Sequence, residues 1–208
     1  MGSLSRAWLG IGLSVRYLKP PPLGGGAFTD HLQGYLLEGW TALTYLAARH
    51  PELQFGHSVL CQSFRNPALL AKMGATLQLL SGGRFLLGLG AGWHGEEYRA
   101  HGYDFPTAGG RGAHLEETVQ IIRALWTPPY ATFAGAHYQI IDATCEPRPD
   151  PIPPLMIGAF KPKMLHLTAR YADEWNVSSQ SIRQYRLLVA AFDRACAEVG
   201  RDPSTVRR

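Results

Sequence analysis

The sequence has few cysteines, few charged side chains and no long apolar run. Cys61, Cys145 and Cys196 are the only cysteines in 208 residues, and their odd number and wide spacing exclude a disulfide framework and a CxxC metal clip. We therefore expect three buried free thiols and a cytoplasmic protein. No run approaches the roughly 20 apolar residues of a membrane span, so we expect no membrane partner.

The charge is low in amount and nearly balanced. Charged residues make up 17% of the chain, and 20 Lys and Arg against 16 Asp and Glu give a net charge of +4. This balance does not indicate a dense basic surface, so we expect no nucleic-acid partner. The 46% of hydrophobic residues excludes a disordered chain, and the length indicates one domain with a sizeable core.

Short apolar segments alternate with amphipathic ones along the chain. We expect helices over 40–49, 67–80, 111–126, 162–172 and 182–199, strands over 53–60, 85–91, 155–158 and 174–177, a hairpin over 133–141, and a further strand starting at 205–208. The alternation predicts an α/β protein with a parallel sheet and right-handed crossovers. A closed (β/α)₈ barrel and an open doubly wound sheet both remain open at this point.

Two helices carry clear apolar stripes. Helical spacing places Leu69, Met73, Leu77 and Leu80 on one face of the segment 67–80. In the segment 111–126 the same spacing aligns Leu115, Val119, Ile122 and Leu125 or Trp126. We expect these two faces to be buried.

Two glycine-containing turns follow strands. Gly88–Gly92 differs from the dinucleotide motif GxGxxG because its third glycine comes one residue early, so we do not expect a Rossmann site. Its glycines either let a planar ligand approach the strand end or allow close packing of the backbone. The turn Gly158–Lys163 precedes a helix and holds two lysines, which indicates either a phosphate site or two solvated lysines.

Titratable residues give weaker signals. Asp30-His31 precedes the first clear helix, and His31 is a candidate acid or base as well as an ordinary hydrogen-bonded side chain. We expect His94, Glu96 and Glu97 to lie in a solvated loop, and we expect no metal site. No GxSxG motif is present, so a serine hydrolase is not supported.

Several motifs occur together in one order. They are Phe64–Lys72, Ser81–Trp93 followed by Glu97-Tyr98 and Gly102–Pro106, Ile121–Trp126 and Ala169–Asn176. With these motifs the sequence resembles the bacterial luciferase-like monooxygenase family of flavin- and deazaflavin-dependent oxidoreductases, from about Phe28 to Arg208. The resemblance implies a (β/α)₈ TIM barrel that binds FMN or the 8-hydroxy-5-deazaflavin coenzyme (factor 420) at its C-terminal mouth. It also implies oxidation or reduction of a small organic substrate, and a homodimer.

The resemblance also implies site residues. It gives His31 the role of acid, base or substrate contact beside Asp30, and it places Ser58 and Val59 in a bulge under the flavin ring that holds a non-proline cis peptide in deazaflavin members. It places Ala91, Gly92 and Trp93 beside the ring, and it assigns the cofactor phosphate to the turn formed by Gly158, Ala159, Phe160, Lys161 and Pro162. Trp93 stands where related sugar-phosphate dehydrogenases carry a glutamate as proton donor, so that reaction is not expected.

The chain is shorter than the roughly 250 residues of a typical barrel. We expect an incomplete barrel over residues 28–208, with an unclear first strand and helix, the last two strands missing, and an aberrant segment at residues 1–27. Such a chain would be a fragment of a longer gene product. The alternative to an active oxidoreductase is therefore a non-catalytic flavin-binding protein or an inactive fragment, which would bind cofactor without turnover.

Overall fold

The computed structural model describes residues 30, 32, 37–177 and 181–208. The helices are α1 (Gly39–Arg49), α2 (Pro67–Leu80), α3 (Gly95–Ala100), α4 (Ala108–Trp126), α5 (Pro162–Tyr171) and α6 (Ile182–Glu198). The strands are β1 (Phe55–Gly56), β2 (Leu60–Cys61), β3 (Phe85–Gly90), β4 (Ala131–Ala134), β5 (Gln139–Ala143), β6 (Leu155–Gly158) and β7 (Glu174–Asn176). The predicted alternation of helices and strands is confirmed.

The strands form one parallel sheet and one hairpin. The sheet has the order β1-β3-β6-β7, and β2 also pairs with β3. Every pair in this sheet is parallel. Arg207 forms a parallel bridge with Glu174, so the segment predicted to start a further strand lies beside β7. The strands β4 and β5 pair antiparallel, as predicted for the hairpin.

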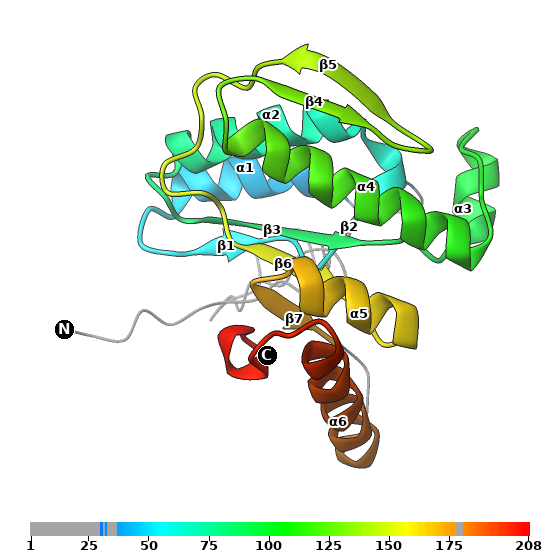
Figure 1. Cartoon of the computed structure of the whole chain (residues 1–208). Coiled ribbons are helices and arrows are strands. Elements are labelled where there is room, and N and C mark those ends of the chain that lie inside the picture. Colours follow the sequence, from blue (N-terminus) through cyan, green and yellow to red (C-terminus); the bar gives the residue numbers. More distant parts are fainter. Residues whose placement is uncertain (1–29, 31, 33–36, 178–180) are drawn as a thin grey trace.

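The helices lie outside the sheet in a curved layer. Figure 1 shows α1, α2 and α4 along one side of the strands, with the β4–β5 hairpin beyond α4 and with α5 and α6 next to β6 and β7. The central strand β3 is buried along its whole length, which confirms the interpretation of its continuous apolar sequence. An inner layer of strands surrounded by an outer layer of helices is typical of a TIM barrel.

Capping residues fix where two of the helices begin. The Asn66 side chain accepts hydrogen bonds from the backbone N–H groups of Ala68 (2.9 Å) and Leu69 (3.3 Å), and Pro67 occupies the first helical position. At the start of α6, Ser181 and Gln184 form a capping box. The apolar stripe predicted for α4 is also confirmed, because Leu115, Val119, Ile122, Leu125 and Trp126 are all buried.

The stripe predicted for α2 is only half correct. Leu77 is buried and Met73 packs against the core, but Leu69 and Leu80 are 54% and 73% exposed. The buried face also contains the small residues Ala71, Gly74 and Ala75. This face receives a side chain of α4, since a Cβ atom on Gly74 would lie 2.8 Å from Trp126 Cζ2. The Trp126 indole N–H donates to the Ala71 carbonyl at 2.9 Å. The small residues let α2 and α4 approach closely, and counting large apolar residues selected a face that coincides only in part with the buried one.

The strand predicted over 53–60 is interrupted. Gly56 pairs with Leu86 and Leu60 pairs with Leu89, so four steps along one strand match three steps along the other. The extra residue makes a β-bulge between β1 and β2. The bulge contains the Ser58-Val59 peptide bond, which is cis. The bulge predicted from the family resemblance is therefore present, and a regular strand is not.

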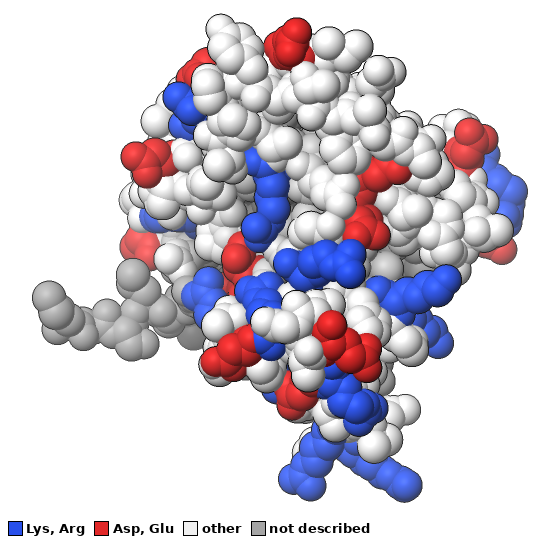
Figure 2. Space-filling view, viewed as in Figure 1, with Lys and Arg blue, Asp and Glu red and all other residues white. Residues whose placement is uncertain are grey.

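The surface carries a mixture of charges. In Figure 2, Lys and Arg side chains are interspersed with Asp and Glu on the face in view. Among the described residues, no helix combines the length and the apolar character that crossing a membrane requires.

Candidate functional site

A small cavity of about 90 Å³ opens where β2 and β3 end. In α/β barrels, ligand sites lie at the carboxyl ends of the strands. The cavity therefore has the position expected for an active site. Its lining residues come from the described part of the chain and are Asp30, Val59, Leu60, Cys61, Phe64, Gly90, Gly92, Trp93, His94, Glu97 and Tyr98.

Asp30 is a buried carboxylate on the wall of the cavity. Its Oδ2 accepts a hydrogen bond from the backbone N–H of Cys61 at 2.6 Å. Arg65 donates to both carboxylate oxygens, at 2.9 and 3.2 Å. Burial raises the pKa of the Asp30 carboxyl, while the Arg65 guanidinium acts in the opposite direction. The carboxylate thus fixes the residue next to His31 against the end of β2. His31 itself lies outside the described residues.

The Val59 side chain packs at the carboxyl ends of β3 and β6. A Cβ atom on Gly90 would lie 2.6 Å from Val59 Cγ2, and one on Gly158 would lie 3.1 Å from the same atom. A Cβ on Gly88 would lie 1.7 Å from the His57 carbonyl oxygen. The chain's own atoms therefore fill the space beside these glycines. Of the two interpretations left open by the sequence, close packing explains Gly88 and Gly90.

Gly92 lies against a thiol and a phenol. It has a φ of +79°, and a Cβ atom there would lie 2.0 Å from the Tyr98 hydroxyl oxygen and 2.8 Å from Cys61 Sγ. The Cys61 and Tyr98 groups lie 2.8 Å apart and share a hydrogen bond. Burial raises the pKa of both groups, so the thiol and the phenol stay protonated at neutral pH. Only glycine satisfies both the backbone conformation and the space.

Glu97 is buried, which contradicts the prediction of a solvated loop. The residue is 2% exposed and lies on α3, with its carboxylate accepting a hydrogen bond from the backbone N–H of Leu32. The His94 Nδ1 atom lies 3.8 Å from Glu97 Oε2. The prediction failed because a six-residue helix turns this side chain inward, which periodicity does not reveal in so short a segment. Within the described ranges, no group of three or more potential ligand side chains is placed to hold a metal ion.

Two large aromatic side chains are exposed at this end of the sheet. Trp93 follows β3 and is 67% exposed, and its ring stacks on His94 at 5.0 Å. Phe160 follows β6 and is 57% exposed, with the Lys161 ammonium 5.6 Å from its ring centroid. Since β3 and β6 are neighbours, both rings stand at the mouth formed by adjacent strands. Such rings offer apolar surface to a ligand.

The turn predicted to bind phosphate precedes α5. Lys161 is the N-cap residue and Pro162 the first residue of the helix. Ala159 is buried, its N–H donates to the Asn176 carbonyl at 3.1 Å, and its carbonyl accepts from the Trp175 indole at 2.8 Å. The backbone N–H and carbonyl of Ala159 are therefore both hydrogen-bonded to β7. Lys161 and the start of α5 remain as groups that could contact an anion.

The structure brings some of the predicted residues together and not others. Asp30, Val59, Gly92 and Trp93 line the one cavity. Ser58 and Ala91 are their chain neighbours but do not line it, and the turn from Gly158 to Pro162 lies at the end of the adjacent strand. Sequence reasoning missed several lining residues, namely Cys61, Phe64, His94, Glu97 and Tyr98. Phe64, Glu97 and Tyr98 belong to the motifs that carry the family resemblance, which was the available signal.

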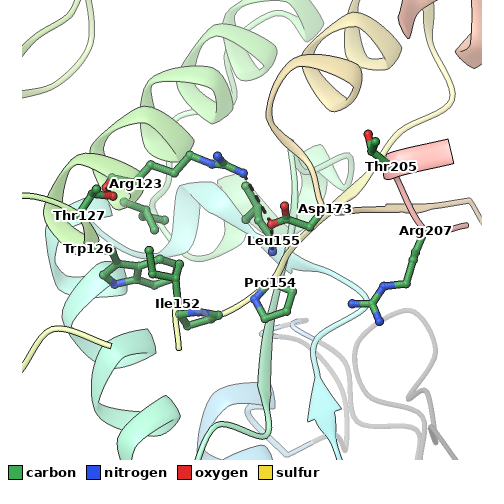
Figure 3. Close-up of a pocket in the computed structure, with 11 residues that line it drawn as sticks. Arg123, Trp126, Thr127, Ile152, Pro154, Leu155, Asp173, Thr205 and Arg207 are labelled. Carbon is green, nitrogen blue, oxygen red and sulfur yellow. Dashed lines mark hydrogen bonds and ion pairs between the residues drawn. The ribbon is translucent and has the colours of Figure 1, made fainter. Parts of the chain in front are cut away.

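A larger cavity of about 480 Å³ lies at the opposite end of the strands. Figure 3 shows it near the amino ends of β6 and β7, between the end of α4 and Arg207. Arg123 pairs with Asp173 at 3.6 Å, and Arg207 pairs with Glu174. The position at the amino ends, where barrels carry no active site, and the paired charges make this cavity a poor candidate.

Comparison with known proteins places these features in one family. The sequence profile of the luciferase-like monooxygenase family matches residues 24–208. An F420-dependent glucose-6-phosphate dehydrogenase of Amycolatopsis mediterranei is 36% identical over 152 residues, which cover 70% of this chain and 46% of that protein. An F420-dependent hydroxymycolic acid dehydrogenase of Mycobacterium tuberculosis is 31% identical over 185 residues, which cover 86% of this chain and 51% of that protein.

The fold has close counterparts among solved structures. An F420-dependent secondary alcohol dehydrogenase, solved with an F420-acetone adduct, superposes with a TM-score of 0.76 at 24% identity over 82% of this chain and 52% of that one. The chain spans about half the length of the curated relatives it matches. Its architecture is part of an α/β TIM barrel of luciferase-like type, as predicted. The family profile covers most of the sequence, and the chain belongs to the luciferase-like monooxygenase family.

Proposed function

We propose that this chain carries the deazaflavin-binding part of an oxidoreductase that transfers hydride between the coenzyme (factor 420) and a small organic alcohol or carbonyl compound. The observation that carries the proposal is the convergence of Asp30, Val59, Gly92 and Trp93 on one cavity at the carboxyl ends of β2 and β3. The choice of coenzyme is supported by two relatives, which are F420-dependent dehydrogenases of different substrates.

The residues at this end of the sheet fit a planar cofactor with an anionic tail. The half-buried Val59 and the exposed Trp93 offer apolar surface to a ring system. The start of α5, with Lys161 and Lys163, offers positive charge to a phosphate. A volume of about 90 Å³ is below the 300–1,000 Å³ or so of typical ligand pockets, so the cavity suits the reacting end of a substrate rather than a whole cofactor.

The chain's own groups divide the work. When bound, the deazaflavin supplies the hydride acceptor or donor. Val59 would support the ring, and Asp30, held by Arg65, fixes the chain next to His31, which would contact the oxygen atom of the substrate. The buried side chains of Leu60 and Tyr98 exclude water from the inner wall of the cavity.

FMN is the second cofactor candidate. An EDTA monooxygenase of Chelativorans sp. BNC1 shares the fold, with a TM-score of 0.70 at 18% identity. With FMN, the reaction would consume oxygen and oxidise the substrate. Incubation with oxidised deazaflavin and 2-propanol, followed by the loss of the coenzyme's visible absorbance, tests the first proposal. Oxygen uptake with reduced FMN, and no reaction with deazaflavin, would favour the second.

The phosphate site has its own test. We expect Lys161→Glu to weaken deazaflavin binding by about tenfold or more, because it replaces an attractive charge with a repulsive one at the helix start. The exposed Lys72 of α2 is the control, since Lys72→Glu makes the same change in charge away from the turn. If the wild type and Lys161→Glu bind the coenzyme with equal affinity, this turn does not bind its phosphate.

The proposal extends to the state of the protein. It describes a cytoplasmic protein, which the free thiols Cys61, Cys145 and Cys196 support, and a homodimer, which follows from the family resemblance alone. Light scattering on the purified chain measures its mass, and a monomer at micromolar concentration would contradict the dimer.

A further inference from the structure

A histidine and a buried carboxylate face each other on the wall of the cavity. His94 Nδ1 lies 3.8 Å from Glu97 Oε2, and both residues line the cavity. The Glu97 side chain is 3% exposed, whereas the His94 side chain is 32% exposed. The pair therefore combines a carboxylate sealed from water with an imidazole that reaches the cavity.

The position of the imidazole is fixed by its neighbours. The His94 backbone carbonyl accepts from the Tyr98 N–H at 3.3 Å at the start of α3, and the ring stacks on Trp93 with 18° between the planes. Nδ1 is buried on the side of Glu97, which puts Nε2 on the opposite edge of the ring. The Glu97 carboxylate is itself held by the backbone N–H of Leu32. At 3.8 Å the contact is an ion-pair distance and not a hydrogen bond, so the Glu97 carboxylate acts on the imidazole through its charge. An imidazole that reaches a cavity beside a sealed carboxylate is suited to acid–base chemistry.

We propose that His94 is a catalytic acid–base residue of this site and that the charge of the buried Glu97 carboxylate assists it. The inference rests on the proposed function. In alcohol oxidation the hydroxyl proton passes to His94 Nε2, the hydride on the same carbon passes to the oxidised deazaflavin, and a carbonyl compound leaves. The Glu97 carboxylate stabilises the imidazolium that forms. In the reverse direction, the same imidazolium returns the proton to the carbonyl oxygen.

The chain contains a matched control pair. His166 Nε2 lies 3.1 Å from Glu198 Oε2 on the surface of α5 and α6, with side-chain exposures of 42% and 61%. This pair has the same chemistry and lines neither described cavity. A change that any His–Glu pair would cause will be seen at both His94 and His166. A change that depends on the cavity will be seen only at His94.

The first test needs no turnover. Carbethoxylation of histidines by diethyl pyrocarbonate is followed residue by residue by mass spectrometry, with and without saturating oxidised deazaflavin. We expect the bound coenzyme to slow modification of His94 about tenfold, because a ring seated on Val59 at the mouth would close the cavity that His94 lines. Modification of His166 should not change. An unchanged rate at His94 with the coenzyme bound would overturn the inference and leave the proposed function standing. Absence of coenzyme binding would overturn both.

The second test measures the proton step. His94→Gln should lower the rate of hydride transfer from 2-propanol about 100-fold or more while the coenzyme dissociation constant stays within about threefold. Glu97→Gln should lower the same rate less, and His166→Gln should leave it unchanged. A His94→Gln protein that binds coenzyme and transfers hydride at the wild-type rate would show that His94 is structural.

Discussion

The guanidinium of Arg65 holds the Asp30 carboxylate through two hydrogen bonds. Nη2 lies 2.9 Å from Oδ1, and Nη1 lies 3.2 Å from Oδ2. The two side chains are 12% and 7% exposed, so this pair is largely removed from water. Arg65 also reaches Glu38 at the start of α1. The Arg65 guanidinium, which follows β2, thus links Asp30 and Glu38, which both precede it.

Replacing Arg65 by methionine should destabilise the protein. We expect Arg65→Met to cost about 3–5 kcal/mol of unfolding free energy, because it leaves the Asp30 carboxylate buried without its cation. Urea denaturation measures the loss. The control is Arg123→Met, since Arg123 pairs with Asp173 at 46% exposure on both sides and should cost under about 1 kcal/mol. Equal losses in the two variants would contradict this account of Asp30.

Gly92 should not tolerate a methyl group. Gly92→Ala adds a Cβ against the Tyr98 hydroxyl to the cost of a positive φ, so we expect a loss of about 3 kcal/mol and weaker cofactor binding. Gly102 has a similar φ of +75°, but a Cβ there would meet no atom within 4 Å. Gly102→Ala should therefore cost only about 1 kcal/mol. Thermal unfolding of both variants separates the backbone effect from the steric one, and identical melting temperatures would refute the clash.

The buried His57 should make the fold sensitive to acid. Burial lowers the pKa of the His57 imidazole to about 3, from about 6.5 in the unfolded chain. The folded state then binds fewer protons, so this contribution to stability is fully present above pH 6.5 or so and is lost as the pH falls towards about 3. The loss is about 1.4 kcal/mol per pH unit in this window.

A variant isolates this contribution. His57→Phe keeps a ring that can stack on Trp40, which lies 5.2 Å away in parallel orientation, and removes the titrating group. Between about pH 6 and 4, the wild type should lose roughly 2–3 kcal/mol more unfolding free energy than the variant. Parallel curves of stability against pH for the two proteins would show that His57 does not titrate as described.

Glu117 should hold the tip of the β4–β5 hairpin. Its carboxylate accepts hydrogen bonds from the backbone N–H groups of Ala136 (2.8 Å), His137 (3.0 Å) and Tyr138 (2.9 Å). Glu117→Ala should speed amide exchange at these three residues at least tenfold or so, because their donors lose a charged acceptor. The neighbouring Glu116 binds Arg170 instead, and Glu116→Ala should leave the tip unchanged. Hydrogen exchange measured by mass spectrometry distinguishes the two.

The regular helices and strands could be predicted from local sequence, whereas the candidate site could be predicted only in part. The apolar stripe of α4 and the buried strand β3 are patterns that burial imposes on consecutive residues, so they were predicted correctly. The packing face of α2 was predicted only in part, because its small residues make room for Trp126, which lies 52 positions beyond Gly74 in the sequence. Tertiary contacts of this kind leave no periodic signal in the chain itself.

The same distinction explains the site. Val59 and Gly92 were identified from a family resemblance, and the structure joins them at one cavity. The partners Arg65 and Glu97 were missed, since charged residues usually lie on the surface and only the fold shows that these are buried. The sequence around Glu97 predicted a solvated loop, whereas the residue is buried in the wall of the cavity.

The central claim is that the carboxyl ends of the strands form a deazaflavin site. A fluorescence titration of the purified chain with the deazaflavin coenzyme and with FMN, in parallel, tests it most directly. We expect saturable quenching of the deazaflavin, weaker or absent quenching of FMN, and a dissociation constant for the deazaflavin that is higher in Lys161→Glu than in the wild type. A folded, monodisperse chain that binds neither cofactor would contradict the claim.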